Sequence, residues 1–237
     1  MPDSSSVAVH AAHSKHNPAL LHHFATEQQQ KDSASLGMWI FLATEVMFFG
    51  GLFCAYLIYR LKYFGEFAAA SQSLSVKLGG TNTIVLICSS LTVVLAIYGA
   101  QHAKRTLMLG SLVLTILLGF AFLGIKSIEY AEKFEKHHVP GPSFQFDSVP
   151  VPGRPGQMAN PAHAQIYFSL YFIMTGLHAL HMIIGLGIFS WLFWKAWRGD
   201  FTPEYHTPLE VGGLYWHFVD IIWIYLFPLL YLIDLRK

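Results

Sequence analysis

The sequence predicts an all-α integral membrane protein, a bundle of five transmembrane helices. Hydrophobic residues make up 54% of the 237 residues and charged residues only 12%, whereas soluble domains usually carry about 25% charged residues. So few charges cannot solvate a globular surface. In addition, five apolar stretches each reach the roughly 20 residues that a helix needs to cross the hydrocarbon core of a bilayer.

The five predicted helices account for most of a transmembrane domain spanning residues 36–237. They cover about residues 36–59, 81–100, 107–125, 164–194 and 214–233. Helices are expected because a segment in lipid must satisfy its backbone hydrogen bonds internally, which an open sheet cannot do. The fourth stretch is the longest, so we expect it to tilt or to project from the bilayer.

The segment before the first helix, residues 1–35, is polar and rich in His, Ser and Gln. It lacks the apolar core of a signal peptide, so the first apolar run is expected to serve as both targeting signal and permanent helix. We expect a solvated, partly disordered tail, with a metal site as the alternative. Its histidines are His10, His13, His16, His22 and His23.

The connections between the helices differ in kind. Residues 101–105 predict a tight turn, and residues 197–210 a polar link. Residues 126–163 predict a long extra-membrane loop with an amphipathic start, because its second part is rich in Pro and Gly.

Composition also narrows the function. A net charge of +1 leaves no basic field for nucleic acid. Cys54 and Cys88 both lie in apolar runs, so we expect small core residues rather than a disulfide or metal ligands. Fewer Lys and Arg residues lie on the N-terminal side of the membrane than on the other, which by the positive-inside rule places the N-terminus outside.

Ionisable side chains within apolar stretches are costly in lipid, so they usually face the bundle interior and have partners. Glu45 lies in the first stretch, His178 and His181 share one face of the fourth, and His217 and Asp220 share one face of the fifth. At 1.5 Å per residue, Glu45 lies about 14 Å, Asp220 about 10 Å and His181 about 20 Å below the N-terminal surface. We therefore expect Glu45, His181, His217 and Asp220 to converge in one half of the bilayer.

Three interpretations of these groups remain open. A buried carboxyl–imidazole network would satisfy them more cheaply than isolated charges. His178 and His217 could instead ligate a haem between two helices. The groups could also form a proton or ion path through this chain. Glu129, at the end of the third stretch, is expected to be interfacial.

Four segments resemble subunit III of the haem–copper oxidases, in the family's order and over roughly residues 36–235. The first contains Glu45, the second begins with Glu129 and Tyr130, and the third contains His178 and His181. The four are GMWIFLATEVMFFGGLF (37–53), Glu129-Tyr130 followed by Glu132, GLHALHMIIG (176–185) and YWHFVDIIWIYLFPLLY (215–231). Glu45 and the WHFVD run are more similar to the cytochrome c oxidase branch than to the quinol oxidase branch. The chain resembles the five-helix bacterial form, which lacks two N-terminal helices of the longest form.

The resemblance implies a non-redox accessory subunit of a proton-pumping terminal oxidase. Such a subunit holds no haem, copper or other metal. It packs against the catalytic subunit I, and the haem and copper are expected in such partner subunits. The accessory subunit itself binds phospholipid and supports proton uptake. Glu45 carries over as the buried carboxylate, and His178, His181, His217 and Asp220 as motif positions. The family form lies in a bacterial inner membrane with a cytoplasmic N-terminus, which we prefer to the charge count.

The resemblance leaves other functions to be tested. Within the family, the chain could serve a quinol oxidase or a nitric oxide reductase. Outside it, a stand-alone transporter or a membrane cytochrome would be expected to work without a partner subunit. As a family member, the chain contributes to an oxygen-reducing, proton-translocating enzyme complex without catalysing the reaction itself.

Overall fold

The computed structural model describes residues 24, 26–142, 144–146, 149–152, 154 and 156–233. They form six α-helices and, within these described ranges, no β-strand, only one isolated bridge between Pro150 and Met158. The helices are α1 (Glu27–Lys62), α2 (Phe64–Ser71), α3 (Val76–Gln101), α4 (Arg105–Glu135), α5 (Pro161–Arg198) and α6 (Thr207–Tyr231). The predicted all-α fold is confirmed.

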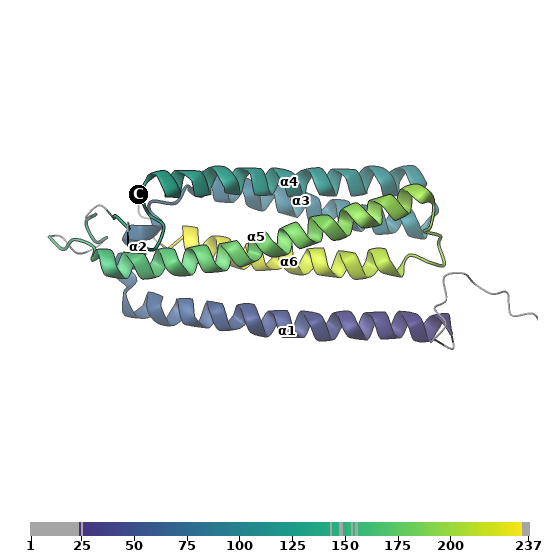
Figure 1. Ribbon diagram of the computed structural model, residues 1–237, viewed down its shortest axis with the longest axis horizontal. Helices are drawn as coiled ribbons and strands as arrows, with labels where there is room; N and C mark the ends of the chain where they lie inside the picture. The colour runs from purple at the N-terminus through teal and green to yellow at the C-terminus, as the bar shows by residue number, and fades with distance from the viewer. Residues whose placement is uncertain are drawn as a thin grey trace, which may run out of the picture.

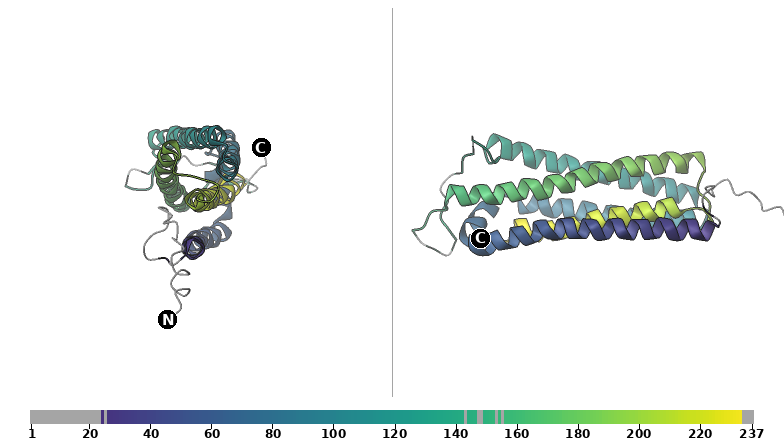
Figure 2. Two further views of the ribbon diagram at one scale, coloured as in Figure 1. Left: turned by 90° about the vertical axis from the view of Figure 1, so that its right-hand side faces the viewer. Right: turned by 60° about the horizontal axis from the view of Figure 1, so that its bottom comes forward.

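Five of these helices, all except α2, are long and apolar enough to cross a membrane. The chain is therefore a multi-pass membrane protein. Helices α3 to α6 form a four-helix bundle, and α1 lies beside it along α6 and α5 (Figure 1). The end-on view in Figure 2 shows α1 outside the ring of the other four.

The helix termini follow local sequence signals. The Thr26 hydroxyl accepts a hydrogen bond from the Gln29 amide, and the Ser75 hydroxyl accepts one from Leu78, so both are N-caps. Asn160 caps α5 in the same way, ahead of a proline at the first helical position. Helix α5 ends at Gly199, whose φ of 87° is the left-handed conformation that glycine adopts most readily.

Several helices extend beyond the ranges expected from hydropathy. Helix α1 begins at Glu27, so residues 27–35 are helical rather than part of a tail, because Thr26 caps them. Helix α4 continues to Glu135, so residues 126–135 are not loop. Their polar side chains Lys126 and Lys133 point inward and are hydrogen-bonded, which a hydropathy pattern does not anticipate.

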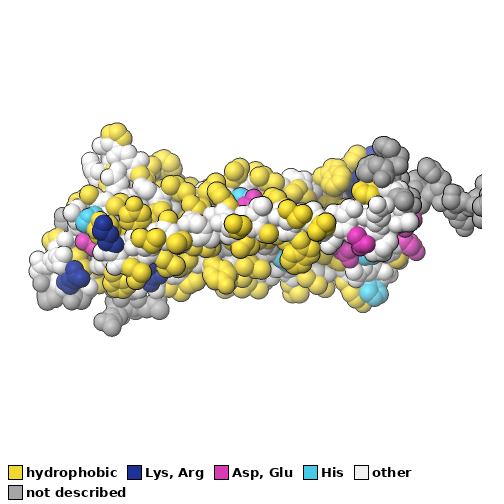
Figure 3. Space-filling view, turned by 90° about the horizontal axis from the view of Figure 1, so that it is seen from below, with side chains coloured by type: hydrophobic (Ala, Val, Ile, Leu, Met, Phe, Trp, Pro, Cys, Tyr) yellow, Lys and Arg dark blue, Asp and Glu magenta, His cyan; other side chains and the backbone are white. Residues whose placement is uncertain are grey.

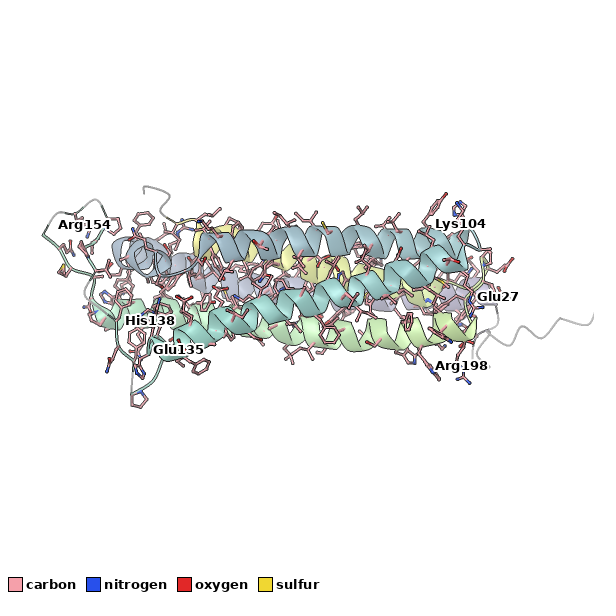
Figure 4. All side chains as sticks on the ribbon, turned by 90° about the horizontal axis from the view of Figure 1, so that it is seen from above. Glu27, Lys104, Glu135, His138, Arg154 and Arg198 are labelled. Carbon is pink, nitrogen blue, oxygen red and sulfur yellow. The ribbon has the colours of Figure 1, made fainter. Side chains whose placement is uncertain are left out.

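Apolar side chains cover the outside of the bundle. On the face that Figure 3 shows, apolar side chains fill the middle, and most Lys, Arg, Asp and Glu side chains lie near the two ends. In Figure 4, Glu27, Lys104 and Arg198 lie at one end, and Glu135, His138 and Arg154 at the other. This distribution suits a bilayer, where apolar side chains face lipid and charges stay near the headgroups.

Two predictions about individual residues have different outcomes. The prediction that Cys54 and Cys88 are core residues is wrong, because both are exposed on the outer surface. An apolar helix face that would be buried in a soluble protein can face lipid here. The five histidines His10, His13, His16, His22 and His23 lie outside the described residues.

The end of α6 is capped by hydroxyl groups from two other helices. The last carbonyls of a helix have no partner within it. The Tyr56 hydroxyl of α1 donates to the Leu229 carbonyl at 2.5 Å, and the Tyr167 hydroxyl of α5 donates to the Leu230 carbonyl at 2.8 Å. These bonds join α1, α5 and α6, and the one from Tyr167 is buried.

Replacing Tyr167 with phenylalanine is expected to lower the free energy of unfolding by about 1 kcal/mol, because the Leu230 carbonyl loses its donor. Thermal unfolding of the detergent-solubilised chain measures this. Tyr225→Phe is the matched control, because this tyrosine on α6 is 60% exposed. Equal stability losses in the two variants would contradict the capping role.

Candidate functional site

Glu45 and His181 form a partly exposed ion-pair site between α1 and α5. His181 Nε2 lies 3.3 Å from Glu45 Oε2, and His181 Nδ1 lies 2.8 Å from the Leu177 carbonyl. Because a carbonyl only accepts, Nδ1 carries a hydrogen. Nε2 therefore faces the carboxyl group, at a distance but not an angle typical of a hydrogen bond. A small rotation of either side chain would let the imidazole and the carboxyl group exchange a proton.

Aromatic groups hold the His181 ring in place. The Phe49 ring contacts it edge-on at 5.3 Å between centroids, and the Tyr215 hydroxyl donates to the His181 carbonyl at 2.9 Å. The side chains of Glu45 and His181 keep 20% and 13% exposure, so the pair lies at the edge of the bundle rather than in its centre.

His217 and Asp220 lie on the side of α6 that faces α3. The Ser90 hydroxyl lies 2.7 Å from His217 Nδ1 and close to the Asp220 carboxyl group. Asp220 is 3% exposed, and neither of its oxygens has a hydrogen bond of normal geometry within the described part of the chain.

His178 lies in the core of the bundle. Its ring packs against Phe122 at 5.4 Å and Trp223 at 5.3 Å between centroids. Among the described residues, neither ring nitrogen has a hydrogen-bond partner. His178 is thus surrounded by aromatic side chains, whereas His217 bonds to Ser90 at the α3 side.

The structure forms two separate pairs rather than the single network expected from helical depth. Glu45 meets His181, and His217 lies with Asp220 near Ser90. No hydrogen bond or ion pair joins the two pairs within the ranges that the structure describes. Helical depth alone did not place them, because it does not tell which way each face of α6 points.

Glu129, which the sequence predicts to lie at the membrane interface, is fully buried among the helices. It belongs to a cluster at one end of the bundle that we call the Lys126 cluster: Lys126, Glu129, Tyr171 and Tyr231. Lys126 Nζ lies 3.0 Å from Glu129 Oε2, and the Tyr171 and Tyr231 hydroxyls donate to Glu129 Oε1 at 3.0 and 2.5 Å. Lys126 was not predicted as a site residue, although its position three residues before Glu129 puts both on one helix face.

Tyr130, the other member of the acidic motif, joins α4 to α5. Its hydroxyl lies 2.5 Å from that of Thr175, which in turn donates to the Tyr171 carbonyl. Lys133, one turn further along α4, donates to the Ser73 carbonyl in the α2–α3 connection. These bonds hold the end of α4 against its neighbours and give it a structural role.

The described residues contain no group of three or more His, Cys, Asp or Glu side chains placed to hold a metal ion. What the described polar groups can do is store or pass a proton at Glu45–His181, accept hydrogen bonds at Asp220 and hold the bundle together at the Lys126 cluster.

The chain as a whole matches a known protein family. The family model described as "Cytochrome c oxidase subunit III" matches residues 19–136 and 160–234 of the chain. The gap between these ranges covers most of the Pro- and Gly-rich loop before α5.

Individual relatives agree with this match. "Cytochrome c oxidase subunit 3" of Gallus gallus is 32% identical over 217 residues, which cover 89% of this chain and 72% of the relative. "Probable quinol oxidase subunit 3" of Staphylococcus haemolyticus is 33% identical over 84% of this chain and 89% of the relative. "Probable cytochrome c oxidase subunit 3" of Nocardia farcinica is 31% identical over 84% of this chain and 87% of the relative. The chain therefore belongs to the cytochrome c oxidase subunit III family.

Proposed function

We propose that this chain is a non-redox accessory subunit of a haem–copper terminal oxidase, a cytochrome c oxidase. The observation that carries the proposal is the family match, which spans all five membrane-crossing helices. In this role the haem and copper belong to partner subunits, and the chain itself binds no metal or haem. Oxygen reduction and proton translocation are activities of the whole complex.

Within the complex, the chain acts as a scaffold against the catalytic subunit I. Its outer surface carries many exposed large apolar side chains, and α1 is the least buried of the five membrane-crossing helices. Such a surface suits contact with lipid and with another membrane subunit. The chain holds phospholipid against the complex and supports proton uptake, with Glu45–His181 as the proton-holding pair. The protein lies in a bacterial inner membrane with its N-terminus in the cytoplasm.

Purification through a tag on this chain, in a mild detergent, tests the proposal. We expect the catalytic subunit to copurify, with a haem spectrum and oxygen consumption supported by reduced cytochrome c. A complex that consumes oxygen with quinol and not with cytochrome c would instead support a quinol oxidase, the function named for the Staphylococcus relative. If the tagged chain purifies alone, or if the isolated chain itself shows a haem spectrum, the accessory role is wrong.

Glu45→Gln is expected to leave assembly intact and to shorten several-fold the number of turnovers before the oxidase loses activity. The substitution keeps the side-chain shape but removes the ionisable carboxyl group that faces His181 Nε2. Oxygen consumption followed over repeated turnovers measures this, with subunit content checked by gel electrophoresis.

Glu135→Gln is the matched control, because Glu135 is an exposed carboxylate at the end of α4. It should behave as wild type. A Glu45→Gln oxidase with an unchanged active lifetime would remove Glu45 from proton uptake while leaving the scaffold role in place.

A further inference from the structure

A groove runs between α3 and α6 on the outer face of the bundle. Its apolar walls include Leu91 and Val94 from α3 and Ile224 from α6, and its polar residues are Ser90, His217 and Asp220. We call it the α3/α6 groove. Leu91 is 60% exposed, Val94 50% and Ile224 45%, so the walls face outward, toward whatever surrounds the chain.

Asp220 is the polar group in the groove for which the described part of the chain offers at most one donor, the neighbouring Ser90 hydroxyl. It is 3% exposed, and its two oxygens lack a hydrogen bond of normal geometry among the described residues. That hydroxyl also lies 2.7 Å from His217 Nδ1, so this carboxyl group has at most one donor, which it does not hold with normal hydrogen-bond geometry. Burying a carboxyl group without a donor is costly, so such a group normally has a partner.

The depth of Asp220 indicates what that partner is. At 1.5 Å per residue, Asp220 lies about 20 Å from the start of α6 and about 17 Å from its end. Asp220 therefore lies near the middle of the membrane-crossing helix, deeper than the about 10 Å expected from the apolar run alone, because α6 begins before that run. Phospholipid headgroups do not reach this depth. A donor at this depth is best supplied by the side chain of another transmembrane helix, because polar side chains of adjacent helices hydrogen-bond to one another in lipid.

We propose that the α3/α6 groove receives a transmembrane helix of a partner oxidase subunit, whose N–H or O–H donor binds the Asp220 carboxyl group. The inference rests on the proposed function, since it requires a partner in the membrane. The apolar walls pack against the apolar face of that helix. The carboxyl group sets the depth at which the helix docks.

Substitution of Asp220 should affect the stability of the isolated chain and its binding to the oxidase in opposite directions. Asp220→Leu removes an unsatisfied buried carboxyl group, so the isolated chain should unfold at the same or a higher temperature. The same variant should dissociate from the oxidase about tenfold more readily in a detergent series, because the partner's donor is left unpaired in the interface. Asp220→Asn keeps a carbonyl acceptor and should stay close to wild type in both measurements.

A photoreactive amino acid at Leu91 identifies the occupant directly. In the intact oxidase, it should form an adduct with a membrane helix of another subunit, mapped by mass spectrometry. The same photoreactive amino acid at Leu117 is the matched control for capture of bulk lipid, because Leu117 lies on the outer face of α4 with a similar exposure of 58%.

Two outcomes overturn the inference. One is a Leu91 adduct with lipid only. The other is an Asp220→Leu variant that remains bound to the oxidase as tightly as wild type. If the wild-type chain copurifies with the oxidase, these results refute the groove contact alone. If it copurifies with nothing, the proposed function itself fails.

Discussion

Replacing Lys126 with methionine is expected to lower the free energy of unfolding by about 3–5 kcal/mol, because it leaves the buried Glu129 carboxylate without its cation. Lys126 is 4% exposed and Glu129 is fully buried, with 3.0 Å between Nζ and Oε2. Unfolding of the detergent-solubilised chain, followed by circular dichroism, measures the loss.

The Lys126 cluster joins three helices, so its loss should lower the stability of the whole bundle. Lys126 and Glu129 belong to α4, Tyr171 to α5 and Tyr231 to α6, and both hydroxyls contact both charges. The ammonium group also lies 5.1 Å from the centre of the Trp223 ring. A desolvated cation so close to aromatic rings gains from their electron-rich faces.

The same helix supplies a matched control. Lys136 and Glu132 form an ion pair of 2.6 Å, but their side chains are 54% and 38% exposed. Lys136→Met should therefore cost less than about 1 kcal/mol. Similar losses in Lys126→Met and Lys136→Met would contradict the interpretation.

A double variant tests whether Lys126 and Glu129 stabilise the chain as a pair or as two independent buried groups. Replacing both charges of the pair, as in Lys126→Met with Glu129→Leu, should cost clearly less than the sum of the single losses, because no uncompensated charge remains. Losses that simply add would show that the two charges do not act as a pair.

The sequence predicted the number and nature of the membrane-crossing helices because that signal depends only on the length and polarity of each apolar stretch. Which face of each helix points inward was harder to predict. In lipid, apolar residues occupy the outer faces as well as the core, so the usual contrast between a polar and an apolar face is weak. Cys54 and Cys88 are examples, since they lie in apolar runs but are exposed.

Some contacts of the polar groups could likewise be predicted from the sequence, and others could not. The pairing of His217 with Asp220 on one face followed from their spacing, and the closeness of Glu45 to His181 followed from depth. The separation of these two pairs did not, because it depends on α6 lying between α1 and α3. Lys126 was placed in a loop because its charge broke the apolar run, although its partners on α5 and α6 keep it inside the bundle. Long-range partners of this kind are not visible in a local pattern.

Close contact between helices also requires a small residue at particular positions. Helix α3 approaches α4 closely at Gly99, just before the turn that joins them. A Cβ atom there would lie 2.8 Å from the Met108 backbone nitrogen and 3.2 Å from the Lys104 carbonyl oxygen. Both neighbours are backbone atoms, which cannot rotate away as a side chain can.

Gly99→Ala is therefore expected to lower the free energy of unfolding by about 1–3 kcal/mol, because the α3–α4 turn must shift to admit the methyl group. Unfolding of the detergent-solubilised chain again measures the change. Gly110→Ala, on α4, is the matched control, since no atom lies within 4 Å of its added Cβ. There the higher helix propensity of alanine should leave stability unchanged or raise it by up to about 1 kcal/mol. Opposite signs in these two variants would locate the constraint in helix contact rather than in helix propensity. A Gly99→Ala chain as stable as wild type would mean that the turn adjusts freely, and that the approach of α3 to α4 does not depend on a glycine at this position.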